Sequence, residues 1–379
     1  MRILYILERF RVKKLIYLIS ISIAWKIVSY IIEWRDGEMQ KIKKVYSLLA
    51  DEKSKTIFEN GVMYRLTGDY KYIRRIIRMD EGGTGSQIFR MLNKTLEHKA
   101  IFGAGITGSS FFQRNNDIRF NCFIDNYKYN SECNGLPVLS PGEFKSKYSG
   151  EGIIIIPETK LHLEMYEQLV EMGFNRNNII DCMAELKKLM HLQYFDLPQL
   201  KERKENKEIF VDGGAYDGTS SVEFVKWCSG CRKKIYVWEP DVISREACSE
   251  RLKKIDVEYK IIPKGLWKDT ELLRFDMQNN SCSNINDEGT MIIEVDSIDN
   301  IIKEPVTFIK MDIEGAEYQA LLGAKNMITQ YKPKLAIAVY HKPEDLWQLP
   351  YLIYEISPTY TFYLRHYSLD SNEIVLYAI

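Results

Sequence analysis

The stretch from Glu208 to Gly218, EIFVDGGAYDG, limits the fold of this chain more than any other. Its apolar residues Ile209 to Val211 predict a buried strand, and the acid and glycines that follow predict a turn into a helix beginning near Thr219. Glycine lets the backbone approach a ligand closely, and the first turn of a helix offers free N–H groups to it. The stretch therefore predicts the nucleotide-cofactor turn of an α/β domain.

A second short strand, Lys234 to Trp238, ends at Glu239, about 20 residues after the glycines, where dinucleotide-type folds place an acid on ribose hydroxyls. The sequence has no GxxxxGK[ST] motif, so no lysine is placed to neutralise a triphosphate. Two strands that end in carboxylates favour a cationic, ribose-bearing cofactor.

Strand and helix patterns alternate through the rest of this half, and the last two strand patterns follow each other directly. Alternation predicts a mostly parallel sheet with helices on both faces, and the last two patterns predict an antiparallel hairpin with its turn at Asp370 to Asn372. The strands are expected at Ile209 to Val211, Ile235 to Trp238, Glu258 to Ile262, Thr307 to Met311, Lys334 to Val339, Tyr360 to Tyr367 and Glu373 to Ala378.

Several spaced motifs lie in the same half: EVDSID from Glu294, FIKMDIEGAE from Phe308, LLGA from Leu321, Lys332-Pro333 and Tyr340-His341-Lys342. Together with the glycine turn they resemble the FkbM family of S-adenosylmethionine-dependent methyltransferases, over roughly residues 208–379. The resemblance implies a seven-stranded, doubly wound methyltransferase sheet with S-adenosylmethionine as cofactor. Gly213, where the family usually has an apolar residue, and Asp217, where asparagine is common, depart from the pattern.

Ligands of such sheets lie at the carboxyl ends of the strands, near the point where the strand order reverses. We therefore expect Asp212 and Gly214 to line the methionine part of the cofactor and Gly265 and Leu266 to flank its adenine. Glu239 can accept hydrogen bonds from both ribose hydroxyls. The complete set of expected cofactor-binding residues is Asp212, Gly214, Ala215, Gly218, Glu239, Gly265 and Leu266.

Four titratable residues, Asp312, Glu314, Glu317 and His341, are expected to converge on the same cleft. Methyl transfer from a sulfonium is an in-line displacement, so the protein must align a nucleophile and remove its proton. We expect His341 or Asp312 to be the base and the other to orient it. Glu314 is expected to position the substrate or to cap its helix. A magnesium ion on Asp312 and Glu314, and methylation of nitrogen, stay open.

An earlier glycine motif, GAGITG from Gly103, follows a strand pattern at 99–102 and precedes a helix and a strand that ends at Asp125. This order is the dinucleotide fingerprint, and it predicts a small Rossmann-like domain. The domain resembles those that accompany sugar-modifying enzymes. Either a nucleotide or nucleotide sugar binds there, or the domain is a docking scaffold. The residues that would hold the ligand are Gly103, Gly105, Gly108 and Asp125.

The amino-terminal stretch Leu15 to Ile32 is strongly apolar and follows a basic run, but it contains Lys26, which is costly inside a bilayer. A membrane-spanning helix, an interfacial helix and a helix packed on the protein all stay open. We expect the chain to divide into an apolar and basic helix at 1–36, a helical accessory region at 37–97, the Rossmann-like domain at 98–184, a helical linker at 185–207 and the methyltransferase domain at 208–379.

Charge and cysteine usage restrict the partners and the compartment. The 52 basic and 52 acidic residues balance, so nothing in the net charge favours nucleic acid. The seven cysteines do not have the spacing of a disulfide framework, which fits a reducing cytoplasm. A cytoplasmic protein could still contact the membrane surface through residues 15–32. Cys228 and Cys231 form a C-x-x-C without a second pair at zinc-ribbon spacing.

The leading hypothesis is an O-methyltransferase that acts on a sugar or another hydroxyl compound in glycan or surface-polysaccharide assembly. One alternative is a nucleotide-sugar dehydrogenase or epimerase that uses the first glycine motif. The absence of a Tyr-x-x-x-Lys catalytic pair argues against this alternative. Another is a scaffold that binds S-adenosylmethionine without using it. Loops such as Met277 to Gly289 are expected to determine substrate selectivity, so the sequence does not predict which small-molecule or glycan acceptor is used. It does not predict the oligomeric state either.

Overall fold

The computed structural model describes residues 37–79, 88, 98–148, 151–191, 193–276, 284–285 and 291–379. The chain divides into two compact units, residues 1–48 and 49–379. The first unit contributes a described helix at 37–48, while the stretch Leu15 to Ile32 and most of the loop Met277 to Gly289 lie outside the described residues. Among the helices of the described residues, none combines the length and apolarity needed to cross a bilayer. The finer division into five segments stays a prediction.

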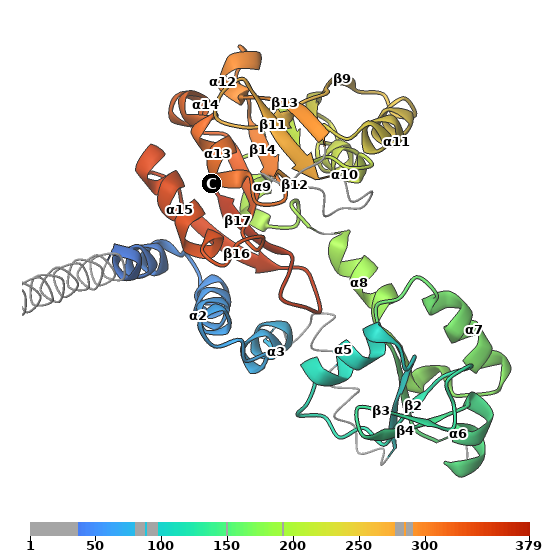
Figure 1. The fold of residues 1–379 in the computed structure, drawn as a ribbon. Helices are drawn as coiled ribbons and strands as arrows, with labels where there is room; N and C mark the ends of the chain where they lie inside the picture. The colour runs from blue at the N-terminus through green and yellow to red at the C-terminus, as the bar shows by residue number, and fades with distance from the viewer. Residues whose placement is uncertain are drawn as a thin grey trace, which may run out of the picture. The chain divides into compact units, whose positions relative to one another are not determined.

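The second unit begins with two helices, α2 (Glu52–Thr67) and α3 (Lys71–Arg78), as expected for the accessory region (Figure 1). The side chain of Asp51 accepts a hydrogen bond from the Ser54 N–H and so caps α2, and Gly68 ends the helix in a left-handed conformation. The hydroxyl of Ser54 accepts a hydrogen bond from the Leu364 N–H at 2.9 Å. This contact fixes the helix to the carboxyl-terminal hairpin.

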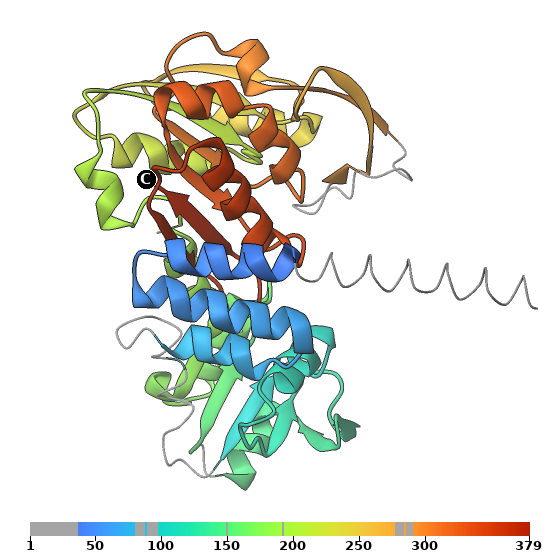
Figure 2. The same ribbon diagram turned by 90° about the vertical axis from the view of Figure 1, so that its left-hand side faces the viewer.

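A small α/β domain follows, drawn in cyan and green in Figure 2. Its six-stranded sheet has the order β3-β4-β2-β1-β5-β6. All neighbours pair in parallel except β3, which pairs antiparallel with β4. Its strands are β1 (Lys99–Phe102), β2 (Cys122–Ile124), β3 (Ser131–Cys133), β4 (Leu136–Leu139), β5 (Ile153–Ile156) and β6 (Ile179–Asp181), and its helices are α5 (Ile106–Arg114), α6 (Pro141–Lys147) and α7 (His162–Glu171). Helix α8 (Cys182–Met190) leads to the next domain. The β3-β4 hairpin was not expected, although Asn134 and Gly135 form its turn with positive φ.

A seven-stranded sheet carries the second α/β domain, in the order β16-β17-β15-β14-β7-β8-β9 (Figure 1). Its parallel strands are β7 (Lys207–Gly213), β8 (Arg232–Trp238), β9 (Glu258–Ile262), β14 (Phe308–Met311) and β15 (Lys334–Ala338), and its antiparallel strands are β16 (Phe362–His366) and β17 (Ile374–Ala378). The predicted mostly parallel sheet and terminal hairpin are confirmed. The strand order reverses between β7 and β14.

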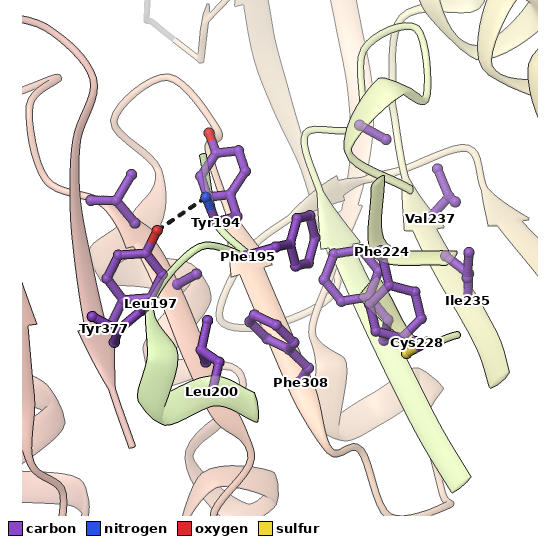
Figure 3. Packing of buried hydrophobic residues seen from close by; sticks show 14 of the residues in the cluster. Tyr194, Phe195, Leu197, Leu200, Phe224, Cys228, Ile235, Val237, Phe308 and Tyr377 are labelled. Carbon is purple, nitrogen blue, oxygen red and sulfur yellow. Dashed lines mark hydrogen bonds between the residues drawn. The ribbon is translucent and has the colours of Figure 1, made fainter. Parts of the chain in front are cut away.

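Helices α9 (Pro198–Glu202), α10 (Thr219–Trp227), α11 (Val242–Leu252), α12 (Ile298–Ile301), α13 (Glu317–Leu322), α14 (Lys325–Tyr331) and α15 (Asp345–Ile356) complete this domain. Every residue of β14 and β15 is buried, which indicates that both faces of the central strands are covered. On one face, Phe195, Phe224, Phe308 and Tyr377 belong to a single core cluster (Figure 3). The rings of Phe210 and Phe224 stack with centroids 4.3 Å apart. This aromatic core fixes the strands at whose ends the site lies.

A separate four-stranded sheet, in the order β10-β13-β11-β12, lies outside the sequence-based expectations. Its strands are β10 (Gly265–Leu266), β11 (Glu271–Asp276), β12 (Asn284–Ile285) and β13 (Met291–Asp296). β10 pairs in parallel with β13, which places Gly265 and Leu266 in the edge strand of this sheet.

A fully buried ion pair joins the beginnings of two strands of the large sheet. The ammonium of Lys334, which is 2% exposed, lies 3.0 Å from Glu208 Oε1, and Glu208 is 0% exposed. The same ammonium donates to the Arg203 carbonyl, and the Thr307 hydroxyl donates to Glu208. Each charge therefore has a partner and additional hydrogen bonds, which a buried ion pair requires.

Candidate active site

A cavity of about 640 Å³ lies at the carboxyl ends of the strands, next to the reversal of strand order. Residues that follow β7, β8 and β14 line it, together with Tyr340 after β15. The cavity is within the size range of small-molecule and cofactor sites. Of the expected cofactor residues, it is lined by Gly214, Ala215, Glu239, Gly265 and Leu266.

The glycine turn depends on two positions that accept only glycine. Gly214 has φ +71°, and a Cβ atom there would lie 1.9 Å from the Asp312 carbonyl oxygen. Gly218 has φ +80°, and a Cβ atom would lie 2.8 Å from the Cys248 sulfur. The first glycine lets the turn pass close to β14, and the second lets α10 pack against α11. Gly218 is therefore structural and does not line the cavity, although it was expected among the cofactor-binding residues.

Asp212 does not line the cavity, in contrast to the expectation that it lies beside the methionine part. It is 0% exposed and accepts hydrogen bonds from the hydroxyls of Ser220 and Ser221. The ammonium of Lys310 lies 3.2 Å from Asp212 Oδ1 and donates to the carbonyls of Gly213 and Gly214. The carboxylate therefore holds the turn and the start of α10 in place, because its oxygens point into the protein.

Glu239 follows β8 and holds the backbone on both sides of the cavity. Its Oε2 accepts a hydrogen bond from the Tyr216 N–H at 2.9 Å, and its Oε1 accepts one from the Asp241 N–H at 3.0 Å. Burial raises the pKa of Glu239 to about 7, although these two N–H groups act to lower it. The carboxyl group therefore titrates near neutral pH.

The raised pKa predicts a pH-dependent stability. The folded state binds a proton that the unfolded state has already lost, so stability falls as the pH rises from about 4.5 to about 7. We expect this decrease to reach about 3 kcal/mol and to be absent from Glu239→Gln. Calorimetric unfolding of both proteins between pH 5 and pH 8 measures the difference. Parallel curves for the two proteins would contradict the assignment.

A cluster of carboxylates and tyrosines surrounds Asp312 in the same cavity. Asp312 Oδ2 accepts a hydrogen bond from the Tyr194 hydroxyl at 2.7 Å, and Oδ1 lies 3.2 Å from the Tyr340 hydroxyl. The Tyr340 hydroxyl also lies 3.3 Å from Glu373 Oε1, and Gln193 donates to the other oxygen of Glu373 at 2.6 Å. Burial and the charge of Asp312 raise the pKa of Glu373 to about 7. Asp312 and Glu373 thus share one tyrosine hydroxyl between them.

His341 lies beside the three acids with which it was expected to converge. Its ring nitrogens are 3.4 Å from Asp312, 3.5 Å from Glu314 and 3.0 Å from Glu317. Burial alone would lower the pKa of His341, but these acids raise it to about 11. Asp312 lines the cavity whereas His341 does not, so the geometry favours Asp312 over His341 as the base.

Strained backbone marks the same cavity. Four non-glycine residues that line it have positive φ: Tyr194 (73°), Tyr216 (49°), Glu314 (55°) and Glu373 (60°). Such conformations are costly and concentrate at functional sites.

Three residues of the cavity were not predicted from the sequence: Tyr194, Gln193 and Glu373. The first two lie in the segment after α8, before the motifs begin, and the third lies in the turn of the last hairpin. Tyr340 was noted only as part of a motif. The charge of Glu373 next to a hairpin turn was the one available signal, and it does not point to a cavity.

In the first glycine motif, backbone N–H groups already bond to the acid that was expected to hold a nucleotide. Asp125 accepts hydrogen bonds from the N–H groups of Ala104, Tyr127 and Lys128 at 2.9 to 3.0 Å. A Cβ atom on Gly108 would lie 1.8 Å from the Gly103 carbonyl oxygen, so this glycine permits close packing of α5 on the strand. The geometry accounts for these residues structurally, and a nucleotide on Gly103, Gly105, Gly108 and Asp125 stays a prediction.

Comparison with known proteins identifies the second α/β domain. Residues 212–367 match the methyltransferase FkbM domain. No curated protein matches the chain. Among solved structures, a methyltransferase FkbM from Methylobacillus flagellatus is 19% identical with a TM-score of 0.46, over 86% of this chain and 99% of that one. The Podospora anserina methyltransferase PaMTH1, bound to SAH, is 11% identical with a TM-score of 0.28, over 58% of this chain and 87% of that one.

An O-methyltransferase from Bacillus cereus in complex with SAH is 11% identical with a TM-score of 0.29, over 58% of this chain and 91% of that one. The match to the methyltransferase FkbM domain thus covers residues 212–367, which lie within the second α/β domain.

Proposed function

We propose that this protein transfers the methyl group of S-adenosylmethionine to a hydroxyl oxygen of a sugar or another polyhydroxyl compound in glycan assembly. One observation carries the proposal: a single cavity joins the acid Glu239 after β8 to the carboxylate and tyrosine cluster around Asp312. The first end suits a ribose and the second suits an acceptor with a proton to lose. A cofactor placed between them would direct its methyl group toward Asp312.

The end of the cavity that contains Glu239 would bind the nucleoside part of the cofactor. The ribose hydroxyls would donate to Glu239, whose carboxylate already faces the cavity from between two backbone N–H groups. The glycine turn at Gly214 would allow the methionine part to lie against the backbone. Gly265 and Leu266 would flank the adenine, because both line the same cavity.

In the reaction, the acceptor oxygen attacks the methyl carbon while the bond from that carbon to sulfur breaks, which leaves S-adenosylhomocysteine and a methyl ether. The hydroxyl proton passes to the carboxylate pair of Asp312 and Glu373. The hydroxyls of Tyr194 and Tyr340 orient this pair from two sides. The acids suit oxygen better than an amine as the nucleophile, since a hydroxyl must lose its proton as it attacks.

We infer the cellular compartment of the reaction from the cysteine side chains. The six cysteines within the described part of the chain are free, including Cys228 and Cys231. Free thiols suit a reducing cytoplasm, where sugar precursors of surface glycans would be available as acceptors.

Asp312→Asn tests the role of the carboxylate pair. The full chain is incubated with methyl-labelled S-adenosylmethionine and a panel of sugars, nucleotide sugars and lipid-linked glycans, and the labelled product is identified by mass. We expect Asp312→Asn to lower the rate by about 10²- to 10⁴-fold, the contribution of one acid–base group, and to leave S-adenosylhomocysteine affinity within a few-fold. Asp269→Asn, which changes an exposed acid outside the cavity, should retain full rate. Unchanged turnover in Asp312→Asn would exclude this mechanism.

A further inference from the structure

Three metal-ligating side chains meet at the acceptor end of the cavity. One atom from each of Asp312, Glu314 and His341 lies within 4.8 Å of the others. The two acids line the cavity, and the side chain of His341, which is 9% exposed, lies behind them. Both ring nitrogens of His341 are buried without an aligned hydrogen-bond partner in the described structure. Three carboxylate oxygens lie 3.0–3.5 Å from these nitrogens, so the ring is surrounded by acids without an aligned hydrogen bond to any of them.

The distances around His341 Nε2 fit an ion shared with two carboxylates. His341 Nε2 lies 3.4 Å from Asp312 Oδ1 and 3.5 Å from Glu314 Oε2, which is nearly symmetrical. A charged N–H would draw one carboxylate to about 2.7–2.9 Å. Two ligand atoms each about 2.1 Å from one ion in tetrahedral geometry lie about 3.4 Å apart. The observed separations match two ligands of a shared ion and are too long for a charge-assisted hydrogen bond.

An outer shell of partners surrounds the three ligands. Glu317 is 0% exposed, and its Oε1 lies 3.0 Å from His341 Nδ1 while it accepts a hydrogen bond from the Ile313 N–H. A metal-bound histidine almost always directs its second nitrogen to a carboxylate or carbonyl in this way. The Tyr194 hydroxyl donates to Asp312 Oδ2, the oxygen that faces away from His341. The ligand atoms are thus held in orientation before any ion arrives.

We propose that Asp312, Glu314 and His341 bind one divalent transition-metal ion with tetrahedral geometry, such as Zn²⁺, at the acceptor end of the cavity, and that Mn²⁺ can replace it as a paramagnetic probe. The imidazole ligand favours a transition metal over the magnesium ion considered for the two acids alone. The ion leaves open coordination positions toward the cavity, where an acceptor hydroxyl would bind. Its chemical role, to polarise that hydroxyl, rests on the proposed function, whereas the binding of the ion does not. Glu373, which is no ligand, then receives the proton.

Mn²⁺ titration of the metal-stripped full chain tests the site. The electron paramagnetic resonance signal of free Mn²⁺ gives the stoichiometry and affinity, and pulsed measurements detect coupling to the ¹⁴N of a bound imidazole. We expect one Mn²⁺ per chain, with ¹⁴N coupling that disappears in His341→Gln. Glu314→Gln and Glu317→Gln should each weaken Mn²⁺ binding by about 10- to 100-fold, the effect typical of lost ligand support.

Glu223→Gln is the matched control. It removes the same charge from an acid that lines the same cavity but pairs with Lys226 instead of approaching His341. Mn²⁺ affinity should stay within about twofold of the wild type in this variant, whereas an equal loss in Glu223→Gln and Glu314→Gln would reduce the site to general electrostatic attraction. Absence of stoichiometric binding, or binding without ¹⁴N coupling, would overturn the proposal. Thermal unfolding of each variant without metal shows that it is folded.

Failure of this inference is distinguishable from failure of the proposed function. Methyl transfer that proceeds at full rate in a chain that binds no Mn²⁺ would remove the ion and retain the methyltransferase. Stoichiometric Mn²⁺ binding with ¹⁴N coupling, in a chain that does not bind S-adenosylhomocysteine, would retain the ion site and remove the proposed reaction.

Discussion

Lys334→Met is expected to lower the free energy of unfolding by about 3–5 kcal/mol, the usual cost of leaving a buried charge without its partner. The methionine matches the length of the lysine stem, so little packing is lost, but Glu208 stays 0% exposed and charged. Urea unfolding followed by tryptophan fluorescence measures the change, because the ring of Trp227 lies 5.8 Å from the Lys334 ammonium.

The double variant Glu208→Gln with Lys334→Met separates charge from packing. The single carbonyl oxygen of glutamine can still accept the hydrogen bond from the Glu205 N–H, its NH2 group can donate to the Thr307 hydroxyl oxygen, and no charge remains buried. We expect it to recover most of the stability that Lys334→Met loses. Lys332→Met, on the surface two residues away, should change stability by less than about 0.5 kcal/mol. A double variant as unstable as the single one would show that the lysine stem matters more than its charge.

Glu239→Ala is expected to weaken S-adenosylhomocysteine binding by at least about a hundredfold. The substitution removes two hydrogen bonds from ribose hydroxyls to a charged acceptor, each worth about 1.5–3 kcal/mol. It also releases the Tyr216 and Asp241 N–H groups that frame the cavity. Titration calorimetry at pH 8, where Glu239 is ionised, measures the loss.

Two comparisons make the result specific. Glu246→Ala changes an exposed acid of α11 outside the cavity and should bind as tightly as the wild type. In the wild type, affinity should also decrease as the pH falls below about 7, because the ribose hydroxyls favour the ionised form of Glu239. A Glu239→Ala protein that binds within threefold of the wild type would place the ribose elsewhere.

The sequence predicts the central strands well because their pattern is local. Ile209 to Val211 and Leu335 to Ala338 are short, continuous apolar runs, and both form buried parts of parallel strands. Asp312, Glu314 and His341 could be expected together because each follows such a strand, and carboxyl ends meet at one edge.

Other features escaped because they depend on distant parts of the chain. Tyr194 reaches Asp312 from a segment 118 residues earlier, and its own neighbours carry no periodic pattern. Asp212 resembles a cofactor residue in sequence, but the hydroxyls of Ser220 and Ser221 draw its carboxylate into the protein. The spacing of residues along a short stretch predicts neither the direction of a side chain nor which distant segment completes a cavity.

The matched stretch 212–367 begins inside β7 and stops before β17, so it is shorter than the unit that must fold. An expression fragment cut to those limits would lack Tyr194, Glu208 and Glu373 and would expose the edge of β15. Any autonomous catalytic fragment therefore has to start ahead of Gln193 and continue to Ile379. Gln193 and Tyr194, in the segment between the two α/β domains, would then form part of the cavity lining. The position of the small domain would therefore affect how a substrate enters the cavity.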